Sequence, residues 1–237
     1  MNKELSVIIP AYNEETHIAN TLKEVSEYLR LHEYTYEILV INDGSRDGTA
    51  GAVRAAAAND PSIQFIHRDK NLGKGQTVRE GVEYARFPIC LFMDADNSTS
   101  IKEWGKFERC FEKGYTVVTA SRHLPESEIV CPQPWSRRFL GAGYRFLSRL
   151  LFELTISDFN CGFKAYETGL AKKIYSEVKM CDWTFDVEVF CLLKKSQCRI
   201  AEVPVHWEHR DKKGGIVPLS TSLRSLKSLL KLKLRFC

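Results

Sequence analysis

The stretch from residue 89 to residue 96 reads ICLFMDAD, an apolar run that ends directly at two carboxylates. Similar apolar runs precede it at 5–10, 36–41 and 63–67. Their apolar residues are continuous rather than alternating, so the four runs predict strands of a parallel sheet that is buried on both faces.

The segments between these strands carry helical signals. Residues 14–31 have apolar side chains at helical spacing, 51–58 are rich in alanine, and 76–85 follow a Gly-Lys-Gly turn. The resulting β-α-β-α-β-α-β order indicates an α/β fold, with a Rossmann-like, mostly parallel sheet and helices on both faces. In such sheets ligands bind beyond the carboxyl ends of the strands.

The composition of the chain narrows its class. Its 237 residues are 44% hydrophobic and 27% charged, which excludes a collagen-like, low-complexity or largely disordered chain. No apolar stretch reaches the ~18 residues of a membrane-spanning helix, and the N-terminus lacks a signal-peptide pattern. Eight cysteines without a CxxC pair predict reduced, mostly buried thiols in a cytosolic protein.

The charge is unevenly distributed. Residues 1–125 carry 15 basic and 18 acidic side chains, whereas residues 126–237 carry 19 and 12. A basic second half indicates an anionic partner such as a phosphate, a membrane surface or a nucleic acid.

Acidic side chains follow three of the predicted strands: Glu14 after the first, Asp43 after the second, and Asp94 and Asp96 after the fourth. Singly they have plainer explanations, since Asp43 could cap the next helix and Asp94-x-Asp96 could be a solvated acidic turn. Together they favour a site, because neighbouring carboxylates repel unless a cation neutralises them. Oxygen ligands suit Mg²⁺ or Mn²⁺, which usually keep substrate phosphates in their coordination shell.

Several motifs, taken in order, resemble the family-2 glycosyltransferases, which have the GT-A fold. These motifs are Pro10–Glu14, Asn42–Ser45, Asn71–Gly75, Asp94–Asp96 and Ser121–Arg122. Two later motifs are similar to the branch that loads sugars onto polyprenyl phosphates, and most of all to dolichyl-phosphate glucosyltransferases: Asp158–Lys164 and Trp183–Glu188. The resemblance covers roughly residues 4–215, and it implies a GT-A catalytic domain at residues 1–215.

The resemblance implies a nucleotide-sugar donor, UDP-glucose rather than GDP-mannose, at the strand ends. The residues that it places around the nucleotide and sugar are Pro10, Ala11, Tyr12, Glu14, Asp43, Lys74, Asp94, Ala95 and Asp96. It implies that Asp96 is the ligand of a divalent metal, Mg²⁺ or Mn²⁺, and that Asp158, and after it Asp186, orients the acceptor or the sugar. His209 is similar to a position near the donor diphosphate.

The resemblance also implies a polyprenyl phosphate acceptor of the dolichyl type. Arg122 follows a strand-like run at 115–120, and Arg137 and Arg138 open the next helix; arginines at these places bind the acceptor phosphate in the similar branch. Guanidinium forks grip phosphate bidentately, which agrees with this role. The alternative is a solvated basic helix start.

The C-terminal segment, residues 216–237, predicts a basic amphipathic helix. On a helical wheel one sector holds Leu219, Leu223, Leu226, Leu230 and Leu234, and the adjoining sector holds Arg224, Lys227, Lys231 and Arg235. Such a helix fits an anionic membrane surface, which predicts a peripheral protein on the cytosolic face of a membrane. The alternatives are a helix that packs on the domain and a helix that binds a membrane-protein partner.

The chemistry that these expectations favour is metal-assisted, inverting transfer of a sugar onto a polyprenyl phosphate, with no nucleic-acid partner. A GDP-mannose-dependent mannosyltransferase is the nearest alternative. A phosphohydrolase of the haloacid-dehalogenase type would use Asp94 as nucleophile but leave Glu14 and Asp43 without a role, and hydrolysis of an aryl phosphate would reveal it. A non-catalytic membrane adaptor would use only the basic C-terminal segment and bind no nucleotide sugar.

Overall fold

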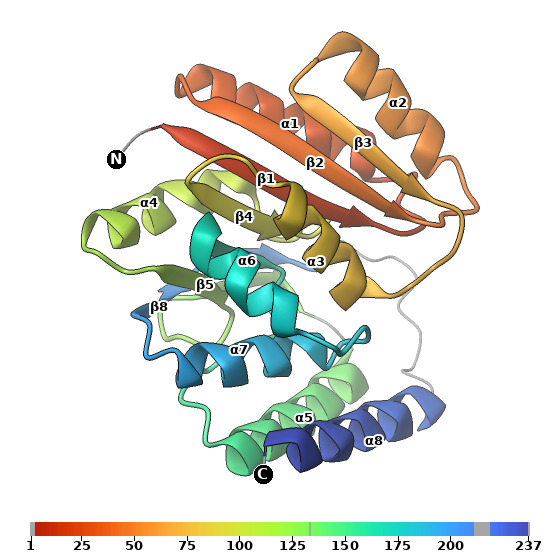
Figure 1. The fold of residues 1–237 in the computed structure, drawn as a ribbon. Coiled ribbons are helices and arrows are strands. Elements are labelled where there is room, and N and C mark those ends of the chain that lie inside the picture. Colours follow the sequence, from red (N-terminus) through yellow and green to blue (C-terminus); the bar gives the residue numbers. More distant parts are fainter. Residues whose placement is uncertain (1–2, 133, 211–218, 237) are drawn as a thin grey trace.

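The computed structural model describes residues 3–132, 134–210 and 219–236, and of residues 219–223 the backbone alone. Its centre is a seven-stranded sheet (Figure 1). The strands of this sheet are β1 (Glu4–Ala11), β2 (Thr35–Asp43), β3 (Ile63–Arg68), β4 (Ile89–Met93), β5 (Val117–Ser121), β7 (Phe163–Glu167) and β8 (Ile200–Pro204). Their spatial order is β3-β2-β1-β4-β7-β5-β8, and only β7 runs antiparallel to its neighbours.

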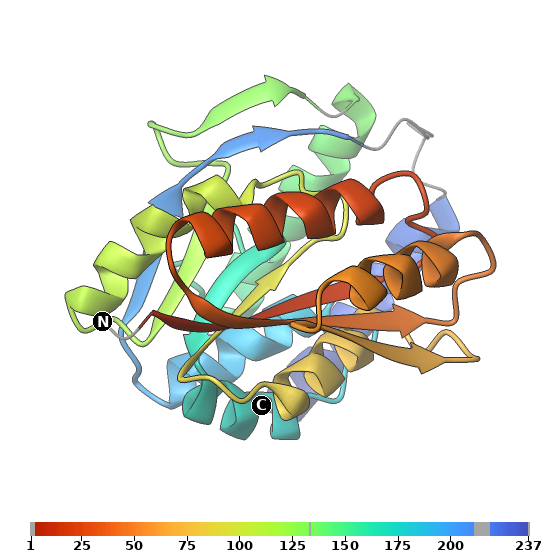
Figure 2. The ribbon, with the colours of Figure 1, turned by 90° about the horizontal axis from the view of Figure 1, so that it is seen from above.

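Helices cover both faces of the sheet (Figures 1 and 2). On one face lie α1 (Ile18–Leu31), α2 (Thr49–Asn59) and α4 (Trp104–Glu112), which follows the short 3₁₀ helix η1 (Ile101–Glu103). On the other lie α3 (Lys74–Tyr84), α6 (Thr168–Glu177) and α7 (Phe185–Lys195). Beyond α7, two further helices lie side by side, α5 (Trp135–Phe152) and α8 (Leu219–Phe236).

The alternation of side chains along β1 explains the two layers. Leu5, Val7 and Ile9 point into the core beneath α1, α2 and α4, whereas Ile8 points to the opposite face, toward α3. Successive residues of a strand face opposite sides of a sheet, so a continuous apolar run supplies both cores. The predicted α/β fold is therefore confirmed.

The chain from residue 200 to residue 208 forms two strands. β8 stays in the main sheet, while β9 (His206–Glu208) pairs with β6 (Glu128–Cys131) in a separate two-stranded sheet. The described cysteines are all free, but the expectation of mostly buried thiols is wrong for Cys131 and Cys181, which are exposed.

The C-terminal helix forms where it was predicted, but the face that packs on the domain is not the predicted leucine face. Leu229 and Leu232 are fully buried in the core on the α7 side, and the ring of Phe236 meets that of Phe152 edge to face. The proposed domain boundary between residues 215 and 216, and the side chains of Leu219 and Leu223, lie outside the described residues. Within the described part of the chain, no helix has the length and apolar character needed to cross a membrane.

Candidate active site

The carboxylates predicted after β1 and β4 do meet at one edge of the sheet. Burial and the charges of Asp96 and Asp94 raise the pKa of Glu14, against a hydrogen bond from His17. Burial and then the charge of Asp94 raise the pKa of Asp96, although its oxygens accept hydrogen bonds from the amide and hydroxyl of Ser98 at 2.9 and 2.7 Å. Two carboxyl groups whose charge is disfavoured, those of Glu14 and Asp96, lie beside a third at Asp94, and a cation would be stabilised among them.

Lys74 already supplies one positive charge there. Its Nζ donates to Oδ1 of Asp94 at 2.6 Å. Burial opposes its charge, but the carboxylates of Asp94 and Asp186 outweigh burial and raise the pKa of Lys74. Gly162 makes room for Asp94, because a Cβ at residue 162 would lie 1.9 Å from a carboxylate oxygen. The lysine therefore stays charged beside the carboxylate pair.

Asp43 anchors the turn that leads to Lys74. Its carboxylate accepts hydrogen bonds from the amides of Leu72 and Gly73 at 2.8 and 2.9 Å, and Arg68 pairs with it at 2.9 Å. Asp43 is only 3% exposed. The structure thus gives Asp43 a role in fixing the 71–75 turn, and its contact with a nucleotide base stays a prediction.

The remaining residues predicted for the donor lie on the same edge. Pro10 and Ala11 end β1, and Ala11 is buried, while Tyr12 beyond them is exposed. Ala95 is buried between the two carboxylates of its motif, and its carbonyl accepts a hydrogen bond from the Thr21 hydroxyl at 2.8 Å.

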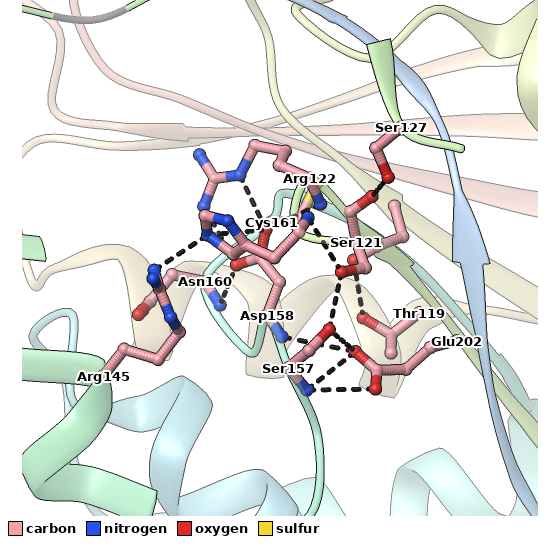
Figure 3. A network of polar contacts seen from close by, with 12 residues as sticks. Thr119, Ser121, Arg122, Ser127, Arg145, Ser157, Asp158, Asn160, Cys161 and Glu202 are labelled. Atoms are coloured by element: carbon pink, nitrogen blue, oxygen red, sulfur yellow. Dashed lines mark hydrogen bonds and ion pairs between the residues drawn. The ribbon is translucent and has the colours of Figure 1, made fainter. Parts of the chain in front are cut away.

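Asp158 and Arg122 form the second part of the site (Figure 3). The Nε and Nη2 of Arg122 donate to the two oxygens of Asp158 at 2.7 and 3.0 Å. Burial opposes the charge of Asp158, but the Arg122 guanidinium outweighs burial and lowers the pKa of Asp158 to about 2. Glu202 of β8 accepts the amide hydrogens of Ser157 and Asp158, which fixes the carboxylate in place. An ionised carboxylate so firmly paired is poorly suited to accept a proton.

Strand directions put this pair at the same edge as Asp94. β5 and β4 both run antiparallel to β7, so Arg122, which follows β5, and Asp94, which follows β4, leave the sheet on one side. The charge of Asp94 is felt by Arg122, as expected for groups at one edge. Arg122, which the resemblance assigned to the acceptor, and Asp94, which it assigned to the donor, therefore lie at one edge of the sheet.

A cavity of about 540 Å³ lies along α5, and one of its lining residues, Arg145, contacts His123, whose Nε2 is 4.0 Å from Asp158. It is lined by Ala142, Arg145, Phe146, Arg149, Leu150 and Leu154. Arg145 donates to Nε2 of His123 at 2.7 Å, so His123 is neutral with its proton on Nδ1. Burial lowers the pKa of His123, which agrees with that state. Two guanidinium groups among apolar side chains suit a ligand with an anionic head and a hydrocarbon tail.

The other predicted arginines lie at the start of α5. Arg137 is half-buried and Arg138 is exposed, and neither lines the cavity. Sequence reasoning missed Arg145 and His123. The available signal was the spacing of Arg145 and Arg149, one helical turn apart within an otherwise apolar stretch.

Asp186 is buried next to the site, where its charge helps to raise the pKa of Lys74. It is 3% exposed and forms an ion pair with the equally buried Lys164 of β7. Burial raises the pKa of Asp186 even though Lys164 stabilises its charge. Rings of Phe92, Phe185 and Phe190 surround the Lys164 ammonium. The Lys164–Asp186 pair is part of the core next to the site carboxylates, and the sequence did not predict that these two residues pair.

Among the described residues, no group of three or more His, Cys, Asp or Glu side chains is arranged to hold a metal ion. His209 follows β9, whose Glu208 amide donates to the Ser98 carbonyl at 2.9 Å. Within the described residues the buried Nε2 of His209 has no hydrogen-bond partner, and the His209 ring stacks on Trp207.

The mostly parallel sheet in the order β3-β2-β1-β4 is the GT-A fold of similar solved structures, and together with the family match to residues 6–175 it defines the class of protein, a glycosyltransferase of the GT-A fold. The chain belongs to glycosyl transferase family 2, whose sequence profile matches residues 6–175.

Curated relatives are similar over most of the chain. The dolichyl-phosphate beta-glucosyltransferase of Dictyostelium discoideum is 32% identical over 99% of this chain and 75% of its own length. The mouse (Mus musculus) protein of that name is also 32% identical, over 99% of this chain and 76% of its own. ALG5C of Trichomonas vaginalis, another dolichyl-phosphate beta-glucosyltransferase, is 35% identical over 84% of this chain and 62% of its own.

Solved structures share the fold at lower identity. Mannosyl-3-phosphoglycerate synthase from Rubrobacter xylanophilus superposes with a TM-score of 0.70 at 17% identity, over 98% of this chain and 74% of that one. Glucosyl-3-phosphoglycerate synthase from Mycobacterium tuberculosis, in complex with Mn²⁺, UDP and glucosyl-3-phosphoglycerate, superposes with a TM-score of 0.67 at 16% identity, over 98% and 79% of the two chains.

Proposed function

We propose that this protein transfers glucose from UDP-glucose to a polyprenyl phosphate of the dolichyl type, with inversion at the anomeric carbon. The observation that carries the proposal is the similarity to dolichyl-phosphate beta-glucosyltransferases over 99% of the chain. The site supports it, because a group of carboxylates with a lysine and a group of cations lie at one edge of the sheet.

In the proposed reaction an oxygen of the acceptor phosphate attacks the anomeric carbon of the donor. The bond from that carbon to the diphosphate breaks, and UDP leaves with the bonding electrons. A phosphate monoester has a second pKa of about 6, so it is largely ionised at neutral pH and needs no general base. The firm pairing of Asp158 with Arg122 agrees with such a mechanism, in which Asp158 orients and positioning dominates.

The residues present fit a divalent metal, Mg²⁺ or Mn²⁺, held by Asp96 with Asp94 close by. The raised pKa of Asp96 indicates a carboxyl group whose charge lacks compensation. Such ions take one or two carboxylates and fill the remaining positions with water and substrate phosphates, so no cluster of three protein ligands is required. When bound, the metal would stabilise the departing diphosphate. The unpartnered Nε2 of His209, among the described residues, lies on the segment beside Ser98 and could contact that diphosphate.

The acceptor fits the α5 cavity and the cations next to it. Arg145 and Arg149 supply positive charge for the phosphate, and Phe146, Leu150 and Leu154 supply apolar contact for the first isoprene units. Arg122 is held by Asp158 and lies close enough to the carboxylates to feel the charge of Asp94. Arg137 and Arg138, in the first turn of α5, remain candidates for the same anionic head group.

The helices α5 and α8 also offer a surface for the membrane that holds the acceptor. Exposed apolar side chains on them are Trp135, Phe139, Leu140, Phe146, Leu150, Leu226, Leu230 and Leu234. Cationic side chains on α8 are Arg224, Lys227, Lys231, Lys233 and Arg235. Apolar burial together with attraction to anionic lipid suits peripheral attachment, and the cytosolic face is the one we propose.

Binding of the donor is tested by thermal unfolding with UDP-glucose, UDP-galactose or GDP-mannose, each with Mn²⁺ or with EDTA. We expect the largest stabilisation with UDP-glucose and Mn²⁺, because a ligand that binds only the folded state stabilises it. Stabilisation by GDP-mannose alone would favour the mannosyltransferase. If no sugar nucleotide stabilises the protein but the protein hydrolyses an aryl phosphate, the phosphohydrolase is favoured. If the protein shows neither sugar-nucleotide binding nor hydrolysis, the adaptor is favoured.

A further inference from the structure

Besides Asp186, the motif Trp183–Glu188 contains side chains that connect α8 to Lys74. The segment 178–184, between α6 and α7, lies against the turn that carries Lys74. The amide of Gly75 donates to the Cys181 carbonyl at 2.9 Å. A Cβ at residue 73 would lie 2.4 Å from the Cys181 carbonyl oxygen, and one at residue 75 would lie 2.4 Å from that of Met180.

These distances explain both glycines. The backbone of the 178–184 segment approaches the lysine turn so closely that only glycine fits at residues 73 and 75. The ring of Trp183 then lies 4.8 Å from the Nζ of Lys74, within the range of a cation–π interaction. The position of the 178–184 segment therefore fixes the position of the lysine.

Glu188 of α7 anchors the 178–184 segment by hydrogen bonds. Its Oε2 accepts the amide hydrogens of Lys179 and Met180 at 3.0 and 2.7 Å, and its side chain is fully buried. The cation that balances this buried carboxylate is Arg235 of α8, which forms an ion pair with Oε1 of Glu188 and also donates to the Glu177 carbonyl at 2.8 Å.

A second contact from α8 holds the other end of the segment. The hydroxyl of Ser228 donates to Oδ2 of Asp182 at 2.6 Å. The other oxygen of Asp182 accepts the Thr184 amide hydrogen at 2.9 Å, so Asp182 shapes the turn that enters α7. α8 is thus bonded to the segment one residue before Trp183 and, through Glu188, at its start.

We propose that Ser228 and Arg235 of α8 are positioning residues for Lys74, so that the helix with the exposed leucine face also orders the donor side of the site. The proposal rests on the proposed function only in taking Lys74 as a donor contact. The bonded path runs from Arg235 through Glu188 to the amides of Lys179 and Met180, and from the adjacent Cys181 carbonyl to Gly75.

The first test is amide hydrogen exchange on the full chain without lipid. The double variant Ser228→Ala/Arg235→Met is compared with Ser225→Ala/Lys173→Met, which also removes one hydroxyl and one positive charge, at a half-buried and an exposed position. We expect exchange at Gly75, Lys179 and Met180 to quicken about tenfold in the first variant only, as when a hydrogen bond to a charged group is lost. Unchanged exchange at these amides would overturn the proposal.

The second test separates positioning from general loosening. With a short-chain, water-soluble polyprenyl phosphate, the first double variant should show a donor KM raised about tenfold and an unchanged acceptor KM. Arg235→Lys, which keeps the charge, should recover part of the donor affinity. Equal loss for donor and acceptor would overturn the proposal. If Ser228→Ala/Arg235→Met fails to fold, the same exchange experiment is carried out on Ser228→Ala alone.

Failure of the proposed function can be distinguished from failure of the proposed link between α8 and the lysine turn. If the wild-type protein neither binds UDP-glucose nor transfers glucose, the proposed function fails, while faster exchange in the first double variant would still support the tie between α8 and the lysine turn. If transfer is normal and both double variants exchange alike, the tie fails and the proposed function stands.

Discussion

Asp158 and Arg122 form a buried ion pair whose geometry limits what each can do. Both oxygens of Asp158 are taken by the guanidinium, and Glu202 holds the backbone beneath them. Removing one partner of a buried pair leaves the other charge uncompensated, which is costly. The pair therefore acts as a unit, and we propose that it presents Arg122 to an anionic ligand.

The first prediction concerns the stability that Asp158 provides. Its pKa is about 2 in the folded protein against an ordinary 3.8, so its contribution is complete above about pH 4 and is lost as the pH falls toward 2. We expect Asp158→Asn to lower the free energy of unfolding by about 3 kcal/mol at pH 7. Urea unfolding from pH 7 to pH 2.5 should show this gap closing below pH 4. A gap that stays constant would contradict the assignment.

The second prediction concerns Arg122 and the acceptor. Lysine keeps the charge but cannot form the two-pronged contact, so Arg122→Lys should raise the acceptor KM by about tenfold and leave the affinity for the donor near that of the wild type. Steady-state kinetics with varied acceptor, and thermal shifts with UDP-glucose, measure the two quantities. Weakened donor binding with a normal acceptor KM would place Arg122 in the nucleotide site instead.

The third prediction concerns the metal. Asp96→Asn preserves size but removes the charge proposed to hold the cation, so turnover should fall by ~10²-fold or more, as for other preorganised electrostatic groups. The matched control is Asp69→Asn, an exposed carboxylate outside the site, which should retain turnover. Full activity of Asp96→Asn in excess EDTA would remove the metal from the account.

At the scale of elements, the first four strands were predictable because burial on both faces leaves an unbroken apolar run. β7 was not, because Lys164 interrupts its apolar pattern and the partner of Lys164, Asp186, is distant in the sequence. Asp158, which precedes β7, and Arg122, which follows β5, were found only through the resemblance. An α/β pattern does not predict an antiparallel strand between β4 and β5.

The C-terminal helix shows a second limit of pattern reading. Its leucines fall on more than one face, and a helical wheel cannot tell which of them will be buried. The structure buries Leu229 and Leu232 and leaves Leu226, Leu230 and Leu234 exposed. Packing on the domain and a free apolar face, which the sequence posed as alternatives, therefore occur in one helix.

The fourth prediction uses these two leucine faces. Leu229→Ala should lower the free energy of unfolding by about 3 kcal/mol, because it leaves a cavity in the core. The triple change of Leu226, Leu230 and Leu234 to serine should alter stability little. It should, however, reduce sedimentation with vesicles that contain anionic lipid and slow transfer to long-chain acceptors. Strong unfolding of the triple variant, with unchanged vesicle binding, would contradict the proposed membrane surface.

For the whole molecule, we propose that the donor site at the strand ends, the acceptor cavity along α5 and the membrane surface on α5 and α8 follow one another in this order. The carboxylates and Lys74 lie at the ends of β1 and β4, Arg122 follows β5, and α5 with α8 lies beyond α7 (Figure 1). A lipid-linked phosphate can then reach the donor without its hydrocarbon chain leaving the membrane, where each buried CH₂ contributes ~0.8 kcal/mol.

The most direct test of the central claim is transfer itself. The protein is incubated with Mn²⁺, dolichyl phosphate and either UDP-glucose or GDP-mannose, and the lipid product is identified by mass spectrometry and its anomeric configuration by NMR. The account predicts dolichyl phosphate carrying one β-linked glucose from UDP-glucose, and little product from GDP-mannose. A mannosylated lipid, an α-linked glucose, or no lipid-linked sugar from a protein that binds UDP-glucose would contradict it.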